Sequence, residues 1–151
     1  VEEGRIRPSK SLQDSLNNML KGNQEFTMID DQKIVFENVV AMAEKSRRDK
    51  KKRVMIVEGG PGTGKSVVSV NLLAELTNRT LVAQYITKNA APRKVYRTKL
   101  KGSMKMSSVD NLFVSSGAFV DVEQNTLDIA IVDEAHRLTK NLICLAEGKI
   151  K

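Results

Sequence analysis

Apolar positions in the first third of the chain repeat at helical spacing. One helix is predicted over residues 11–21, where Ser11 and Asp14 form a variant of the capping box. A second helix is predicted from about residue 31 to residue 45. The side chains expected on the buried faces of these two helices are Leu12, Leu16, Met19, Leu20, Val35, Val39 and Met42.

The rest of the chain alternates short apolar runs with helical segments. Strands are predicted at residues 54–57, 81–86 and 127–132. The segment Val67–Asn78 is apolar on more than one side, which suits a helix packed between a sheet and another layer. Strands that alternate with helices in this way are typical of an α/β fold with a parallel sheet.

Between residues 87 and 120 the pattern is weaker. Pro92 fits the first turn of a helix that has Asn89 near its cap. Residues 102–110 have the composition of a flexible loop, and residues 111–120 are predicted to form a short strand and a turn.

Composition places the chain among globular proteins. Its 151 residues are 40% hydrophobic, enough for one domain with a single core. A net charge of +7 favours an anionic partner. The one cysteine, Cys144, predicts a reducing, cytoplasmic environment. No apolar run approaches the ~18 residues of a membrane helix, and the polar N-terminus is unlike a secretory signal, so we expect no membrane partner.

Residues 58–66 read Glu-Gly-Gly-Pro-Gly-Thr-Gly-Lys-Ser and lie between a predicted strand and a predicted helix. This spacing matches the G-x-x-x-x-G-K-[ST] phosphate loop, or Walker A motif. Glycines let backbone N–H groups close around a polyphosphate, and the helix N-terminus adds partial positive charge. Lys65 is suited to the β- and γ-phosphates, and the Ser66 hydroxyl to Mg²⁺. The alternative is a glycine-rich turn without a ligand. The candidate nucleotide-binding residues here are Gly59, Gly60, Pro61, Gly62, Thr63, Gly64, Lys65 and Ser66.

A second chemical element follows the last predicted strand, where Asp133-Glu134-Ala135-His136 has the form of a Walker B motif. Asp133 at a strand tip is suited to the Mg²⁺ shell opposite Ser66. Glu134 is placed to orient or deprotonate an attacking water, so Glu134 and Lys65 are the catalytic candidates. His136 either couples the γ-phosphate to a neighbouring site or is an ordinary surface histidine.

Three further features have two interpretations each. Gln32 either reads the donor and acceptor of an adenine edge with its amide or faces solvent. The basic run at residues 47–53 is a solvated linker or a phosphate-contacting patch. The segment at residues 87–93 follows a strand, at the sheet edge where ligands bind. Its side chains contact a nucleic-acid backbone or cap a helix, and the candidates are Thr87, Lys88, Asn89 and Arg93.

Taken together, these strings resemble the first motor lobe of a superfamily 1/2 helicase, and more narrowly the Schlafen group 3-like DNA/RNA helicase domain. The resemblance covers most of residues 8–139. It implies a RecA-like three-layer α/β/α parallel sheet that binds ATP and Mg²⁺ and acts on single-stranded DNA or RNA. By resemblance, Gln32 falls at the adenine-reading Q motif, residues 59–66 at motif I, residues 87–93 at motif Ia and residues 133–136 at motif II.

The chain departs from the helicase pattern at its end. The family continues into a further strand, motif III, a second RecA-like lobe and an arginine finger, and residues 139–151 are too few to supply them. We therefore expect a fragment, with an N-terminal segment and helix at residues 1–24 and a partial RecA-like lobe at residues 25–151. The missing lobe would be a partner, and a missing arginine finger is worth about 10³–10⁵-fold in rate.

The sequence is consistent with three alternative functions. The first is an ATP-hydrolysing motor lobe stimulated by nucleic acid. The second is a nucleotide switch that gates a partner domain without unwinding. The third is a nucleic-acid-binding module with an inactive nucleotide site, against which the intact Lys65 and Glu134 argue.

Overall fold

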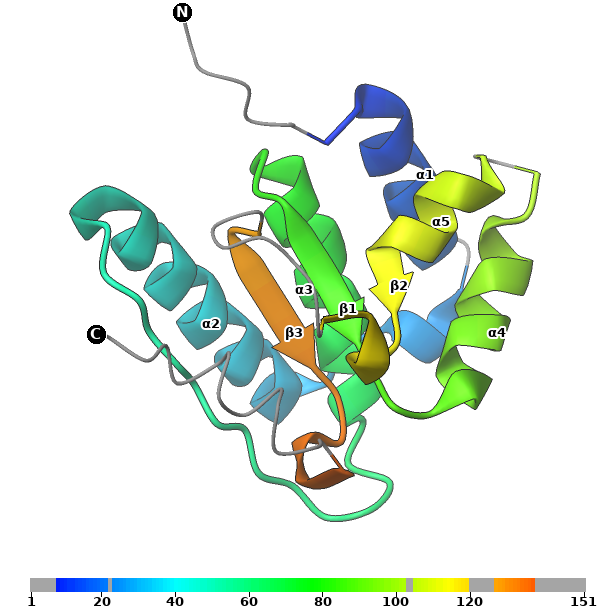
Figure 1. Cartoon of the computed structure of the whole chain (residues 1–151). Coiled ribbons are helices and arrows are strands. Elements are labelled where there is room, and N and C mark those ends of the chain that lie inside the picture. Colours follow the sequence, from blue (N-terminus) through cyan, green and yellow to red (C-terminus); the bar gives the residue numbers. More distant parts are fainter. Residues whose placement is uncertain (1–7, 22, 103–104, 120–126, 138–151) are drawn as a thin grey trace, which may run out of the picture.

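The computed structural model of the chain describes residues 8–21, 23–102, 105–119 and 127–137 (Figure 1). Within these ranges it is an α/β structure with a three-stranded parallel sheet and five α-helices. The helices are α1 (Lys10–Lys21), α2 (Asp30–Asp49), α3 (Lys65–Asn78), α4 (Ala90–Leu100) and α5 (Met106–Leu112). The strands are β1 (Ala83–Ile86), β2 (Phe113–Val114) and β3 (Ile129–Val132), and short 3₁₀ turns are η1 (Gln24–Phe26), η2 (Ser116–Phe119) and η3 (Ala135–Arg137).

Strand β1 lies in the centre of the sheet, in the order β2-β1-β3. Tyr85 of β1 is in register with Phe113 of β2 and with Ile131 of β3, and both pairings are parallel. The carboxyl ends of β1 and β3 therefore meet at one edge of the sheet, where ligands of parallel α/β folds bind. The backbone N–H of Asp133 donates to the carbonyl of Ile86 at 2.9 Å, so the pairing continues to the first acid of the predicted pair.

Helix α3 is the centre of the core. It contacts β1, α1 and α2, so it is apolar on more than one side, as predicted. Its buried residues are Val68, Val70, Leu72, Leu73, Ala74, Leu76 and Thr77. Leu16 and Met19 of α1 and Val40 and Ala43 of α2 pack into the same core. Each fully buried leucine stabilises the fold by about 1.5–3 kcal/mol, so this helix holds the layers together.

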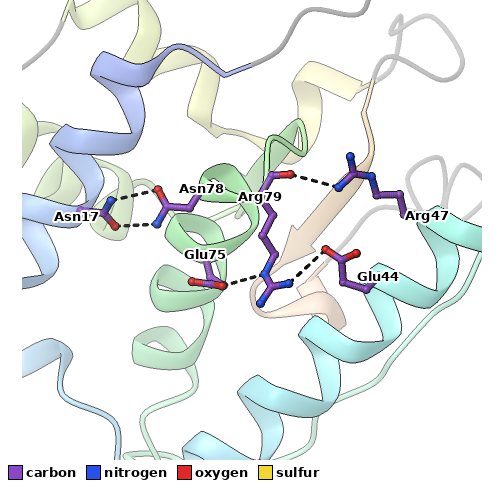
Figure 2. Close-up of polar contacts among 6 residues, drawn as sticks. All are labelled: Asn17, Glu44, Arg47, Glu75, Asn78 and Arg79. Atoms are coloured by element: carbon purple, nitrogen blue, oxygen red, sulfur yellow. Dashed lines mark hydrogen bonds and ion pairs between the residues drawn. The ribbon is translucent and has the colours of Figure 1, made fainter.

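Polar contacts join the C-terminal end of α3 to α1 and α2 (Figure 2). Asn17 and Asn78 exchange two side-chain hydrogen bonds, at 3.1 and 2.9 Å. The Arg79 guanidinium pairs with Glu75 at 2.8 Å and with Glu44 at 3.4 Å. Exposed ion pairs are individually worth about 0–1 kcal/mol, so the pairs of Arg79 add little to stability beside the apolar core.

One predicted strand is wrong. Residues 54–57 pair with no strand of the sheet, and their side chains are exposed, with Val54 at 71% and Ile56 at 80%. Among the described strands β3 lies at an edge of the sheet. A run of strand-forming residues becomes a strand only through hydrogen bonds to a neighbour, and residues 54–57 form no such ladder with that edge. Here the run passes alongside α2 instead, where Val35, Met55 and Ile56 help line a hollow of about 430 Å³.

Two local predictions are also corrected. Helix α1 begins at Lys10, and the Ser9 hydroxyl accepts the backbone N–H of Leu12, so Ser9 rather than Ser11 supplies the cap. The loop predicted at residues 102–110 contains the start of α5, because Val109 and Leu112 are buried against the sheet.

The remaining helix and strand predictions are confirmed with shifted ends. Predictions for Cys144, residues 1–7, residue 120 and residues 139–151 fall outside the described residues. Within the described ranges, no helix combines the length and the apolar character needed to cross a membrane.

Candidate functional site

The glycine loop at residues 58–66 is closed by its own lysine. Lys65 Nζ donates to the carbonyls of Gly59 and Gly60 at 2.5 and 2.8 Å, and Thr63 Oγ1 donates to Gly60 at 2.8 Å. Gly64 caps α3 in the left-handed region with φ of +77°. The ammonium group therefore lies inside the turn of the loop, at the N-terminus of a 14-residue helix. That position favours an anion, because the helix end and the lysine are both positive.

Gln32 joins the loop to the second helix. Its side-chain oxygen accepts the backbone N–H of Ile29 at 3.0 Å, at the start of α2. Its side-chain nitrogen donates to the carbonyl of Thr63 at 2.9 Å. A Cβ on Gly64 would lie 2.1 Å from this nitrogen, so only glycine lets the amide approach so closely. Gln32 thus links the start of α2 to the glycine loop, and adenine recognition by it stays a prediction.

The loop and the acid pair meet at the sheet edge. Ser66 Oγ lies 3.5 Å from Asp133 Oδ2, although 67 positions separate the two residues. The same carboxylate oxygen accepts the Tyr85 hydroxyl at 2.5 Å, and Asp133 Oδ1 accepts the backbone N–H of Glu134 at 3.0 Å. Burial raises the pKa of Tyr85 well above its ordinary value, and the hydrogen bond and charge of Asp133 act in the same direction. Tyr85 is therefore protonated and donates to the carboxylate.

Glu134 and His136 come just after Asp133 along the chain. Glu134 is half-buried and has a φ of +52°, a left-handed conformation that is uncommon for a side-chain-bearing residue. Such backbone outliers concentrate at functional sites, where the surrounding structure holds them. His136 lies in η3 and is exposed. The structure thus brings Ser66, the residue after Lys65, beside Asp133, the residue before Glu134, at the edge of the sheet.

The donor set fits magnesium. Mg²⁺ is usually held by one or two carboxylates together with substrate phosphates and water, rather than by a cage of protein ligands. Ser66 and Asp133 offer one hydroxyl and one carboxylate beside the glycine loop. Within the described ranges, no group of three or more His, Cys, Asp or Glu side chains gathers in a way that could hold a metal ion. A closed structural metal site is absent there, whereas an open one shared with phosphate is chemically suitable.

The segment at residues 87–93 divides into two kinds of residue. Thr87 is fully buried and accepts the backbone N–H of Asn89, and Asn89 caps α4 by accepting the N–H of Ala91 at 3.0 Å. Asn89 therefore has the capping role that the sequence left open, and Thr87 holds the turn before it. Lys88 is exposed, and Arg93 lines a hollow of about 160 Å³ between α4 and α5. Contact of any of the four with nucleic acid stays a prediction.

A parallel sheet with a glycine loop and an acid pair at one edge defines an α/β domain compatible with a RecA-like fold. The family model for the Schlafen group 3, DNA/RNA helicase domain matches residues 52–149, which is more than half of the chain. The chain belongs to this family, as the sequence strings indicated. Membership in the family indicates a helicase-related function that involves nucleic acid. Gln32 precedes the matched region. Searches of curated proteins and of solved structures found no match.

Sequence reasoning missed one member of the site. Tyr85 lies inside a predicted strand, and nothing in its neighbourhood along the chain marks it as more than a core residue. Its contact with Asp133 joins positions 48 residues apart, so only the pairing of β1 with β3 reveals it.

Proposed function

We propose that this chain is the ATP-binding and ATP-hydrolysing motor lobe of a helicase-like protein. The observation that carries the proposal is the approach of Ser66 Oγ to Asp133 Oδ2, directly beside the lysine of the glycine loop. A phosphate-holding loop and a metal-holding carboxylate at one sheet edge are the parts that β–γ bond cleavage requires.

Each residue has a role in this proposal. The loop N–H groups and Lys65 would hold the β- and γ-phosphates, and Ser66 and Asp133 would hold Mg²⁺, which would supply positive charge beside those phosphates. Glu134, the next residue along, orients the attacking water and takes its proton. Gln32 recognises adenine, for which its amide would exchange its present bonds to Ile29 and Thr63. His136 couples the γ-phosphate to a neighbouring site. Full turnover also needs a second RecA-like lobe that supplies an arginine finger.

Single-stranded DNA or RNA is the second partner in the proposal. The hollow of about 160 Å³ beside α4 is lined by Arg93, Lys94 and Arg97, with Asp110 as its acidic member. Arg97 pairs with Asp110 at 3.3 Å, whereas the Nε atom of Arg93 is buried and has no hydrogen-bond partner among the described residues. The half-buried Arg93 and the exposed Lys94 place positive charge beside this hollow, and such charge favours a phosphate backbone as partner.

The test measures binding first and turnover second. Calorimetric titration of the chain with MgATP should show binding that Lys65→Ala weakens roughly 10–100-fold, because a hydrogen bond to a charged group is worth about 1.5–3 kcal/mol. Lys33→Ala, which removes an exposed lysine 4.0 Å from Asp30, is the matched control and should bind as the unaltered chain does.

ATP turnover is then measured with and without single-stranded DNA or RNA, as a rate relative to that of the unaltered chain. Glu134→Gln should bind MgATP and lose hydrolysis. ATP turnover that survives Lys65→Ala would refute the proposal. Stimulated hydrolysis without unwinding of a tailed duplex would favour the nucleotide switch instead.

A further inference from the structure

Tyr85 is a buried polar group that the proposed chemistry does not use. Its side chain is fully buried in the central strand, and its hydroxyl donates to Asp133 Oδ2 at 2.5 Å. That oxygen is the one that faces Ser66 Oγ at 3.5 Å. The tyrosine therefore holds the carboxylate oxygen that lies nearest the hydroxyl of the glycine loop.

The ring of Tyr85 is itself held by an aromatic cluster. Tyr96 of α4 meets it edge-on with centroids 5.9 Å apart, and Phe113 of β2 lies at 5.7 Å. Tyr96 and Phe113 stack on each other at 4.9 Å, and Phe26 lies 6.2 Å from Tyr96. Aromatic rings packed at these distances restrict one another's rotamers. Tyr96 of α4 and Phe113 of β2 thus hold the Tyr85 ring, and with it the position of the hydroxyl.

Asp133 is held from three directions. Tyr85 and Ser66 lie against one of its oxygens, and the backbone N–H of Glu134 donates to the other at 3.0 Å. Of these, only the tyrosine comes from the middle of the sheet, where packing fixes it. Groups that hydrogen-bond a metal ligand set its orientation, and their removal typically weakens metal affinity 10–100-fold.

We propose that Tyr85 is a positioning residue, which orients the Asp133 carboxylate toward Ser66 so that both can hold Mg²⁺. The inference rests on the proposed function, because it assumes a nucleotide with its metal at this edge. The aromatic cluster extends the positioning to α4, whose first turn lies within the segment at residues 87–93. A shift of α4 would thus reach the carboxylate through Tyr96 and Tyr85.

The experiment removes one oxygen atom. Tyr85→Phe keeps the ring and its aromatic contacts but loses the hydroxyl. The matched control is Tyr96→Phe in the same cluster, whose hydroxyl makes no hydrogen bond within the part of the chain that the structure describes. Binding of a non-hydrolysable ATP analogue with an imido β–γ bridge is followed by calorimetry, once in EDTA and then across a series of MgCl₂ concentrations.

In Tyr85→Phe, the magnesium concentration for half-maximal enhancement of binding should rise about tenfold or more, with binding in EDTA unchanged. Tyr96→Phe should match the unaltered chain in both. An unchanged magnesium requirement in Tyr85→Phe overturns the inference and leaves the proposed function standing. No binding by the unaltered chain, or equal binding by Lys65→Ala, is instead a failure of the proposed function.

Folding of each variant is checked by circular dichroism. If Tyr85→Phe loses its fold while Tyr96→Phe keeps it, the hydroxyl is a requirement of the core, and the inference is likewise overturned. A merely structural loss would also weaken binding in EDTA, whereas loss of positioning affects only the magnesium-dependent part.

Discussion

Replacement of Gly64 by alanine tests how the glycine loop is held. Gly64 has φ of +77° and ψ of 29°, and a left-handed conformation costs a residue with a Cβ about 1–2 kcal/mol. The new Cβ would lie 2.1 Å from Gln32 Nε2, so the amide must move away from the Thr63 carbonyl. Loss of that hydrogen bond adds about 0.5–1.5 kcal/mol. We expect Gly64→Ala to lower the free energy of unfolding by about 1.5–3.5 kcal/mol.

The matched control is Gly62→Ala in the same loop. Gly62 has φ of +75° but nothing within 4 Å of an added Cβ, so it should show only the backbone cost of about 1–2 kcal/mol. Urea unfolding followed by circular dichroism gives both values. Removal of the amide by Gln32→Ala should make the effect of Gly64→Ala shrink to that of Gly62→Ala, as a double-mutant cycle would show. Equal losses for the two glycine variants would refute the close packing of Gln32 against the loop.

Two further predictions concern single side chains. Gln32→Ala should reduce the preference for ATP over GTP about tenfold in calorimetric titrations, the worth of roughly one hydrogen bond; an equal loss for both nucleotides would limit Gln32 to holding the loop. The Asp49 carboxyl should titrate by carbon-13 NMR with a pKa of about 2, chiefly because Arg53 donates to it. Since the folded pKa is lowered, the stabilising contribution is present above the ordinary value of about 3.9 and is lost as the pH falls through about 2. Arg53→Met should return the pKa toward that ordinary value, and an unchanged pKa would contradict the pairing.

The sequence predicts elements well where one period dominates. Helix α3 is read from Val67–Asn78 almost without error, because its apolar residues and the glycines before it agree. Helix α5 is missed, since its 7 residues are too short for a helical period to be visible beside serines and Gly102. The run at residues 54–57 is misread for a different reason. Its composition is that of a strand, but a strand forms only by hydrogen-bonding to a neighbouring strand. The residues of the run do not determine whether such a pairing forms.

The candidate site divides in the same way. The order of Lys65, Ser66 and Asp133 follows from local motifs, and the topology of a parallel sheet predicts that they meet. The contacts of Gln32 with Thr63 and of Tyr85 with Asp133 span 31 and 48 positions, and no local spacing encodes them. What a motif provides is the chemistry of the site, whereas the groups that hold its members in place come from the packing of the core.

The aromatic cluster behind Asp133 also determines how the molecule behaves optically. The chain has no tryptophan and two tyrosines, Tyr85 and Tyr96, whose rings lie edge to face at 5.9 Å. Near-ultraviolet dichroism and intrinsic emission therefore arise mainly from this pair. Because a phenol that donates to a carboxylate is partly quenched, a cation arriving at Asp133 would change the light emitted by Tyr85. Tyr85 emission is thus an intrinsic signal for cation binding at Asp133 and requires no added label.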